Sequence, residues 1–133
     1  MNHFSDIGRN LGLAFQIRDD ILGIWGDQSE TGKPAGNDIR RHKKSYPVVF
    51  ALDNSNGPLR DELIALYQNP VVSDPTVNQV LQIFESLGAK ASAQKMVEAY
   101  SNQAWQSFKR LDLSPPNKQR MEEIVQFLTG RTY

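Results

Sequence analysis

Residues 13 to 44 read LAFQIRDDILGIWGDQSETGKPAGNDIRRHKK, and they join a helical pattern to a long polar segment. Apolar side chains recur at spacings of three, four and seven between Phe4 and Leu22, so we expect one helix over residues 4 to about 24. The segment from Gly26 to Lys44 then holds three glycines, a proline and many polar residues, which predicts a long functional loop.

Prolines, capping residues and glycines divide the rest of the chain into further helices, and no segment has a convincing strand pattern. We expect these helices to begin near Pro47 after a Ser45 cap, to run from Pro58 to about Tyr67, from an Asp74 cap to Gly88, from Ala89 to Leu111, and from Ser114–Pro116 to Gly130. The predicted fold class is all-α, with one helical domain over residues 1–133.

The bulk composition excludes several classes of function. Lysine plus arginine and aspartate plus glutamate number 15 each, so no net charge attracts nucleic acid or a membrane surface. The chain has no cysteine, which excludes disulfides and thiolate chemistry and fits a reducing cytoplasm. No stretch approaches the roughly 20 apolar residues of a membrane span, and the N-terminus lacks the pattern of a signal peptide. We expect a soluble, cytoplasmic protein.

Two adjacent aspartates lie on the first predicted helix. Residues three and four apart share a helix face, so Gln16, Asp19, Asp20 and Gly23 form one stripe. Two carboxylates side by side repel each other, and a Mg²⁺ ion, which needs few protein ligands and shares substrate phosphates, relieves that repulsion. A solvated acidic pair on an exposed face is the alternative interpretation of Asp-Asp alone.

The loop that follows supplies positive charge. Glycines in Thr31-Gly32-Lys33 and Ala35-Gly36 permit close backbone approach, and Lys33 carries a point charge suited to phosphate. Four more basic residues follow it: Arg40, Arg41, Lys43 and Lys44. Alone, this run is typical of a solvated patch; beside a carboxylate pair it becomes a candidate clamp for a diphosphate. It is not a P-loop, because the upstream glycine spacing and the preceding strand are missing.

Other chemistry-bearing residues have simpler interpretations. His3 and His42 lie far apart without a third ligand, which argues against a zinc site. Trp25 and Trp105 are interpreted as packing residues.

The motif resembles the second aspartate-rich region of the trans-prenyl diphosphate synthases, the polyprenyl synthetase family. Thirteen residues of this chain fall in register with the family pattern: Phe15, Gln16, Asp19, Asp20, Gly26, Asp27, Thr31, Gly32, Lys33, Gly36, Asp38, Lys43 and Ser45. The motif covers about a quarter of the chain, and beyond it the resemblance extends only to helical character.

The resemblance implies a role for each matching position. Asp19 and Asp20 bind Mg²⁺ that bridges to an allylic diphosphate, and Lys33 and Lys43 contact that diphosphate as it leaves. Gln16 lies near the reacting centre, and Phe15 helps to line the pocket. The implied reaction ionises the allylic diphosphate, attacks it with the double bond of isopentenyl diphosphate and removes a proton. A homodimer is the implied assembly.

Two departures from the family pattern stand out. Gly23 occupies the position where the motif usually ends in a third aspartate, and the chain contains no second Asp-Asp pair for the family's upstream motif. We therefore expect the C-terminal portion of such an enzyme, inactive by itself. The alternatives are a non-catalytic helical subunit that only folds and associates, and a terpene synthase with similar metal chemistry.

Overall fold

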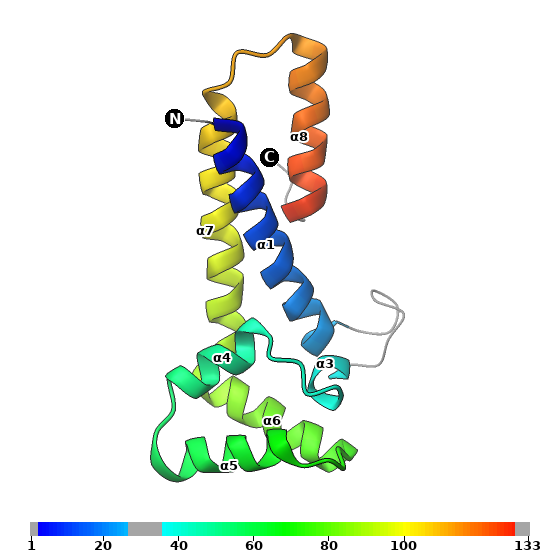
Figure 1. Ribbon diagram of the computed structural model, residues 1–133, viewed down its shortest axis with the longest axis vertical. Coiled ribbons are helices and arrows are strands. Elements are labelled where there is room, and N and C mark those ends of the chain that lie inside the picture. Colours follow the sequence, from blue (N-terminus) through cyan, green and yellow to red (C-terminus); the bar gives the residue numbers. More distant parts are fainter. Residues whose placement is uncertain (1–2, 27–35, 130–133) are drawn as a thin grey trace. The chain divides into compact units, whose positions relative to one another are not determined.

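The computed structural model describes residues 3–26 and 36–129, and its regular elements are all helices (Figure 1). In chain order they are α1 (His3–Trp25), α3 (Asn37–Arg40), α4 (Tyr46–Asp53), α5 (Gly57–Gln68), α6 (Asp74–Leu87), α7 (Ala89–Lys109) and α8 (Pro115–Thr129). The predicted all-α class is confirmed, since no strand occurs in the described residues. Within the same residues, no helix is long and apolar enough to cross a membrane.

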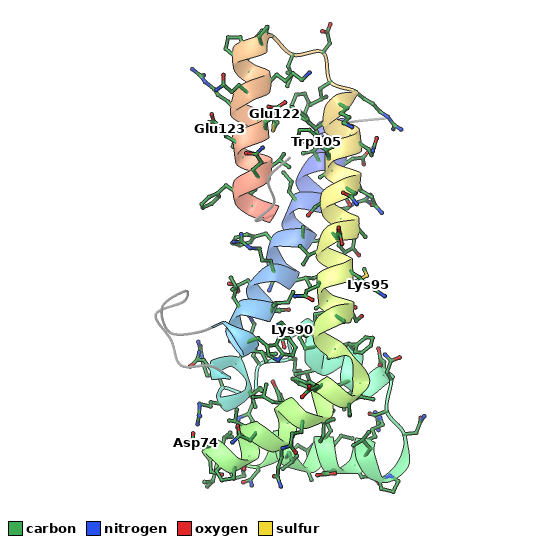
Figure 2. All side chains as sticks on the ribbon, turned by 180° about the vertical axis from the view of Figure 1, so that it is seen from behind. Asp74, Lys90, Lys95, Trp105, Glu122 and Glu123 are labelled. Carbon is green, nitrogen blue, oxygen red and sulfur yellow. The ribbon has the colours of Figure 1, made fainter. Side chains whose placement is uncertain are left out.

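The described residues divide into two compact units, and the first combines residues up to 18 with those from 94 onward. Its apolar cluster takes side chains from α1, α7 and α8: Ile7, Leu11, Ala104, Phe108 and Val125. Trp105 on α7 (Figure 2) packs against this cluster, with its ring centroid 5.1 Å from that of Phe108. This tryptophan therefore has the packing role expected from the sequence.

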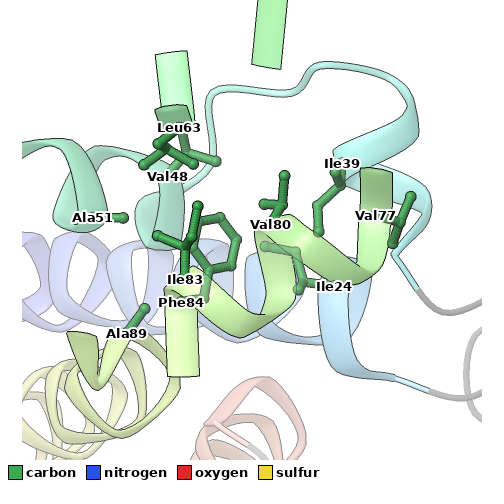
Figure 3. Close-up of a cluster of buried hydrophobic side chains, with 10 residues drawn as sticks. All are labelled: Ile24, Ile39, Val48, Ala51, Leu63, Val77, Val80, Ile83, Phe84 and Ala89. Atoms are coloured by element: carbon green, nitrogen blue, oxygen red, sulfur yellow. The ribbon is translucent and has the colours of Figure 1, made fainter. Parts of the chain in front are cut away.

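The second unit covers residues 19–93 and contains the larger core (Figure 3). Ten buried side chains form it: Ile24, Ile39, Val48, Ala51, Leu63, Val77, Val80, Ile83, Phe84 and Ala89. Trp25 packs on this cluster with its ring 6.1 Å from that of Phe84. Burial of these side chains fixes the last turn of α1 against α3, α4 and α6. The prediction of one domain over residues 1–133 stays a prediction.

Two helix starts differ from the sequence-based expectation. The cap of α6 is Ser73 and not Asp74, because the Ser73 hydroxyl accepts a hydrogen bond from the backbone N–H of Thr76 at 3.3 Å. Asp74 is instead the first residue of the helix. Ser45 does occupy the N-cap position of α4, which begins at Tyr46, but its side chain makes no capping hydrogen bond.

The helix ends follow the sequence more closely. Gly88 ends α6 with φ of 73°, a left-handed conformation that glycine adopts without steric cost. α7 ends at Lys109, two residues before the predicted Leu111. The predicted stop at Gly130 lies outside the described residues.

The sequence predicted a loop over residues 26 to 44, and the structure differs in part of that range. Residues 37–40 form the short helix α3, which buries Ile39 in the core of the second unit. Apolar contact with α6 therefore gives helical structure to a segment whose glycine and polar content predicted only loop.

Candidate functional site

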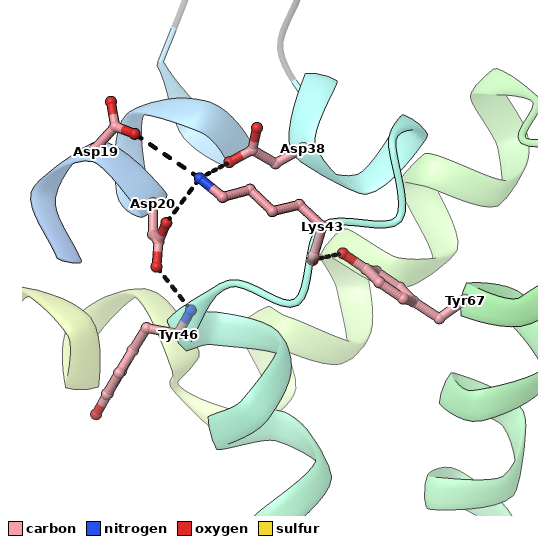
Figure 4. A network of polar contacts seen from close by, with 6 residues as sticks. All are labelled: Asp19, Asp20, Asp38, Lys43, Tyr46 and Tyr67. Atoms are coloured by element: carbon pink, nitrogen blue, oxygen red, sulfur yellow. Dashed lines mark hydrogen bonds and ion pairs between the residues drawn. The ribbon is translucent and has the colours of Figure 1, made fainter. Parts of the chain in front are cut away.

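The two adjacent aspartates of α1 lie in different environments. The Asp19 side chain is 59% exposed, whereas that of Asp20 is 7% exposed. Both carboxylates nevertheless face the same lysine from a later segment, as Figure 4 shows. The pair is therefore not a uniformly solvated acidic face: one carboxylate is open to solvent, and the other is buried.

Asp20 carries out the capping role that the sequence assigned to Ser45. Its Oδ2 accepts a hydrogen bond at 2.9 Å from the backbone N–H of Tyr46, the first residue of α4. A negative charge at the N-terminus of a helix satisfies an unpaired donor and complements the helix dipole. The sequence could not show this because Asp20 lies 26 positions before Tyr46.

A series of backbone hydrogen bonds brings the chain back to the aspartates. The N–H of Gly36 donates to the carbonyl of Ile24 at 2.9 Å, with Gly36 in a left-handed conformation that leads directly into α3. At the other end of α3, His42 has a positive φ of 55°, and its Nε2 lies 2.8 Å from the carbonyl oxygen of Asn69. The N–H of Lys43 then donates to the carbonyl of Asp38 at 2.9 Å.

The Lys43 ammonium lies among three carboxylates. Its Nζ is 3.1 Å from Asp20, 3.6 Å from Asp38 and 3.8 Å from Asp19. Burial by itself lowers the pKa of Lys43, but the hydrogen bond to Asp20 and the negative charges of all three aspartates outweigh it, so the pKa lies above its usual value. Lys43 thus stays positively charged at physiological pH.

Tyr67 of α5 supports the segment that carries Lys43. Its hydroxyl donates a hydrogen bond to the backbone carbonyl of Lys43 (Figure 4). Burial, together with the charges of Asp38 and Asp20, raises the pKa of the Tyr67 phenol. The hydroxyl therefore keeps its proton and remains a donor.

Gly23 adjoins the carboxylate of Asp38. A Cβ atom placed on Gly23 would lie 2.0 Å from Asp38 Oδ2, far inside van der Waals contact. The position of the missing third aspartate is thus filled by a carboxylate that comes from α3. Sequence reasoning placed Asp38 in register but gave it no role, because its proximity to Gly23 depends on the return of the chain through Gly36.

The sequence also predicted roles for Phe15, Gln16 and Lys33. Phe15 and Gln16 are exposed positions on α1 in the first unit, and their roles stay predictions. Lys33 lies outside the described residues. Arg40 forms an ion pair with Asp74 of α6.

The donor set suits a Mg²⁺ ion that is shared with a ligand. Carboxylate oxygens are the hard donors that Mg²⁺ takes, and the ion commonly uses one or two carboxylates plus phosphates and water. The position of the Lys43 ammonium shows that these carboxylates favour a cation. Among the described residues, no three side chains of the metal-binding types are close enough to hold an ion by themselves. The fit is therefore to a metal completed by phosphate, not to a closed protein cage.

The described residues thus define a helical protein in which paired aspartates hold a lysine ammonium. The family model described as "Polyprenyl synthetase" matches residues 1–84. The chain belongs to the polyprenyl synthetase family.

Two relatives show what share of a longer family member this chain matches. The chain is 59% identical over 63 residues to a geranylgeranyl diphosphate synthase of Mycobacterium tuberculosis (strain ATCC 25618 / H37Rv), a match that covers 47% of this chain and 18% of that protein. It is 32% identical over 127 residues to a geranylfarnesyl diphosphate synthase of Aeropyrum pernix, covering 95% of this chain and 39% of that one. The chain thus spans two fifths or less of these relatives' lengths.

Solved structures agree with this assignment. A polyprenyl synthetase from Streptomyces coelicolor A3(2) is similar with a TM-score of 0.85 and 29% identity, over 95% of this chain and 39% of that one. A geranylgeranyl pyrophosphate synthase from Corynebacterium glutamicum, complexed with isoprenyl diphosphate and magnesium, gives a TM-score of 0.84 and 25% identity, over 96% and 36%.

Proposed function

We propose that this chain carries the aspartate-rich diphosphate site of a prenyltransferase that condenses isopentenyl diphosphate with an allylic diphosphate to give longer prenyl diphosphates in isoprenoid biosynthesis. The observation that carries the proposal is the arrangement of Asp19, Asp20 and the Lys43 ammonium within 3.1–3.8 Å. Family membership supports it, as does the Corynebacterium glutamicum relative that is complexed with isoprenyl diphosphate and magnesium.

The proposed chemistry requires that a departing diphosphate be neutralised. Asp19 and Asp20 would hold Mg²⁺, which supplies positive charge to the phosphate oxygens when it is bound. Lys43 adds a charge-assisted hydrogen bond, since its raised pKa keeps the ammonium protonated. In the same proposal Lys33 is a second contact to the diphosphate, Gln16 lies near the reacting centre, and Phe15 lines the pocket.

The 133 residues alone do not complete a reaction, because their sequence holds a single Asp-Asp pair and the family chemistry uses two aspartate-rich motifs. The functional assembly is a homodimer. Its location is the cytoplasm, which the lack of cysteine supports.

The first experiment measures binding of inorganic pyrophosphate by calorimetry, with and without Mg²⁺. We expect Mg²⁺-dependent binding that Asp19→Asn weakens by about 10–100-fold, since losing even a group that only supports the metal ligands costs this much. Asp61→Asn, at an exposed position of α5, is the matched control and should bind as the wild type does. Equal binding by Asp19→Asn and wild type would refute the assignment of the site.

The second experiment supplies the chain with Mg²⁺, isopentenyl diphosphate and an allylic diphosphate. We expect no elongated prenyl product, although pyrophosphate binds. Product formation by this chain alone would show that a single aspartate-rich motif is sufficient, and it would overturn that part of the proposal.

A further inference from the structure

The Asp38 carboxylate occupies the space where a side chain at position 23 would begin. The Cβ position of residue 23 would lie 2.0 Å from Oδ2, 2.4 Å from Cγ and 2.8 Å from Oδ1 of Asp38. Gly8 and Gly12, on the same helix, have no described atom within 4 Å of the corresponding position. A Cβ atom at position 23 would therefore collide with the Asp38 carboxylate, whereas a Cβ atom at position 8 or 12 would contact no described atom.

The Asp38 carboxylate is buried in this volume. Its side chain is 10% exposed, and Oδ2 has no hydrogen-bond partner among the described residues. A buried carboxylate oxygen without such a partner is costly unless an opposite charge faces it. The charge that faces it is the Lys43 ammonium at 3.6 Å, and the backbone hydrogen bond from Lys43 to Asp38 holds the two residues together a second time.

We infer that Gly23 and Asp38 act as a pair, in which the glycine leaves space for the Asp38 carboxylate and Asp38 positions the Lys43 ammonium beside Asp19 and Asp20. The third carboxylate of the site thus comes from α3 and is directed at the lysine. Because Asp19 and Asp20 are the proposed metal ligands, Asp38 is the carboxylate that keeps Lys43 in place to meet a diphosphate. This inference rests on the proposed function, and Asp38 is a positioning residue in it.

A double-mutant cycle without ligand tests the pairing itself. In wild type, Gly23→Ala should lower the midpoint of thermal unfolding by roughly 3–6 °C, the shift expected when about 1 kcal/mol is lost in a chain of this size. In an Asp38→Ala background, which removes the carboxylate, the same substitution should raise the midpoint, because alanine favours a helix. Gly12→Ala is the matched control and should raise it in both backgrounds. An equal effect of Gly23→Ala in the two backgrounds would overturn the pairing.

A second cycle tests whether Asp38 acts through Lys43. With Mg²⁺ present, Asp38→Ala should weaken pyrophosphate binding about tenfold, as expected for a poorly oriented charge-assisted contact. In a Lys43→Ala background it should have no further effect. The affinity for Mg²⁺ alone should change by less than about threefold, because Asp38 is not a proposed ligand. An equal loss in both backgrounds would refute the positioning role.

The Asp19→Asn variant separates this inference from the proposed function. If Asp19→Asn does not weaken Mg²⁺-dependent pyrophosphate binding, the proposed function fails, and the positioning role fails with it. If Asp19→Asn abolishes binding while Asp38→Ala leaves it unchanged, the proposed function stands and the inference alone is wrong.

Discussion

The two parts of α1, residues 3–18 and residues 19–25, differ in which side chains they bury and in what lies beside their glycines. In residues 3–18 one face is buried by apolar side chains, while the other presents exposed apolar residues and glycines with open space beside them: Phe4, Gly8, Gly12 and Phe15. In residues 19–25 the helix buries Ile24 and also the charged side chain of Asp20. Here the glycine has a carboxylate against it.

Residue type alone does not determine what a helix position does. A glycine in a helix interior costs about 0.5–1 kcal/mol relative to alanine wherever it stands. At Gly23 this cost is offset, because the space holds Asp38 and through it Lys43. At Gly8 no described neighbour offsets the cost. The contrast can be tested by substitutions on both parts of the helix.

The largest effect is expected where the second part of α1 enters the core. Ile24 is 1% exposed, so Ile24→Ala should lower the free energy of unfolding by about 2–5 kcal/mol through lost burial and a cavity. Leu13→Ala, at a position 39% exposed in the first part, should cost less than about 1 kcal/mol. Urea unfolding measures both. Equal losses would remove the distinction between the two parts.

The two aspartates should separate stability from binding. Asp20→Asn removes a buried charge that accepts the Tyr46 N–H and faces Lys43, so it should cost about 1–3 kcal/mol of unfolding free energy. Asp19→Asn, with its side chain mostly exposed, should change stability by less than about 0.5 kcal/mol.

Calorimetric titration of the same two variants with Mg²⁺ and pyrophosphate completes this prediction. Both should bind pyrophosphate more weakly than wild type. If Asp20→Asn proves as stable as Asp19→Asn, the buried charge of Asp20 that faces Lys43 does not stabilise the fold.

How well the sequence predicts this protein depends on how local each determinant is. The long helices follow from apolar spacing along the chain, and Gly88 ends its helix by its own backbone conformation. The short helix α3 was not predicted, because it depends on the burial of its Ile39 side chain in the core of the second unit. Local propensity does not contain that contact.

The site divides in the same manner. Asp19, Asp20 and Lys43 were predicted to lie together because the family motif keeps them in fixed order, and the structure brings them within 3.1–3.8 Å. The cap of α4 by Asp20 was not predicted, because the donor N–H of Tyr46 meets it only after the chain returns. The use of Gly23 was missed for the same reason: a glycine in a sequence does not show which side chain fills the space beside it.

The exposed apolar side chains of the first part of α1 should drive self-association, as the proposed homodimer requires. Replacing Phe4 and Phe15 with serine should weaken association by about tenfold or more, since each removes exposed apolar surface from the same face of the helix. Sedimentation velocity across a concentration series measures this. Val71→Ser, at a residue 72% exposed in the second unit, is the control and should leave association unchanged. A wild-type chain that stays monomeric at all concentrations would contradict the prediction.

The smallest effect is expected at Gly8, and it tests whether a second copy of the chain packs over the exposed face of α1. Because no described atom lies within 4 Å of an added Cβ, Gly8→Ala should raise the free energy of unfolding of the dilute monomer by about 0.5–1 kcal/mol. If a second copy packs closely over this face, the same methyl group should also weaken association, although it stabilises the monomer. Urea unfolding at low concentration and sedimentation at high concentration separate the two effects. A destabilised monomer would mean that position 8, like position 23, is already filled.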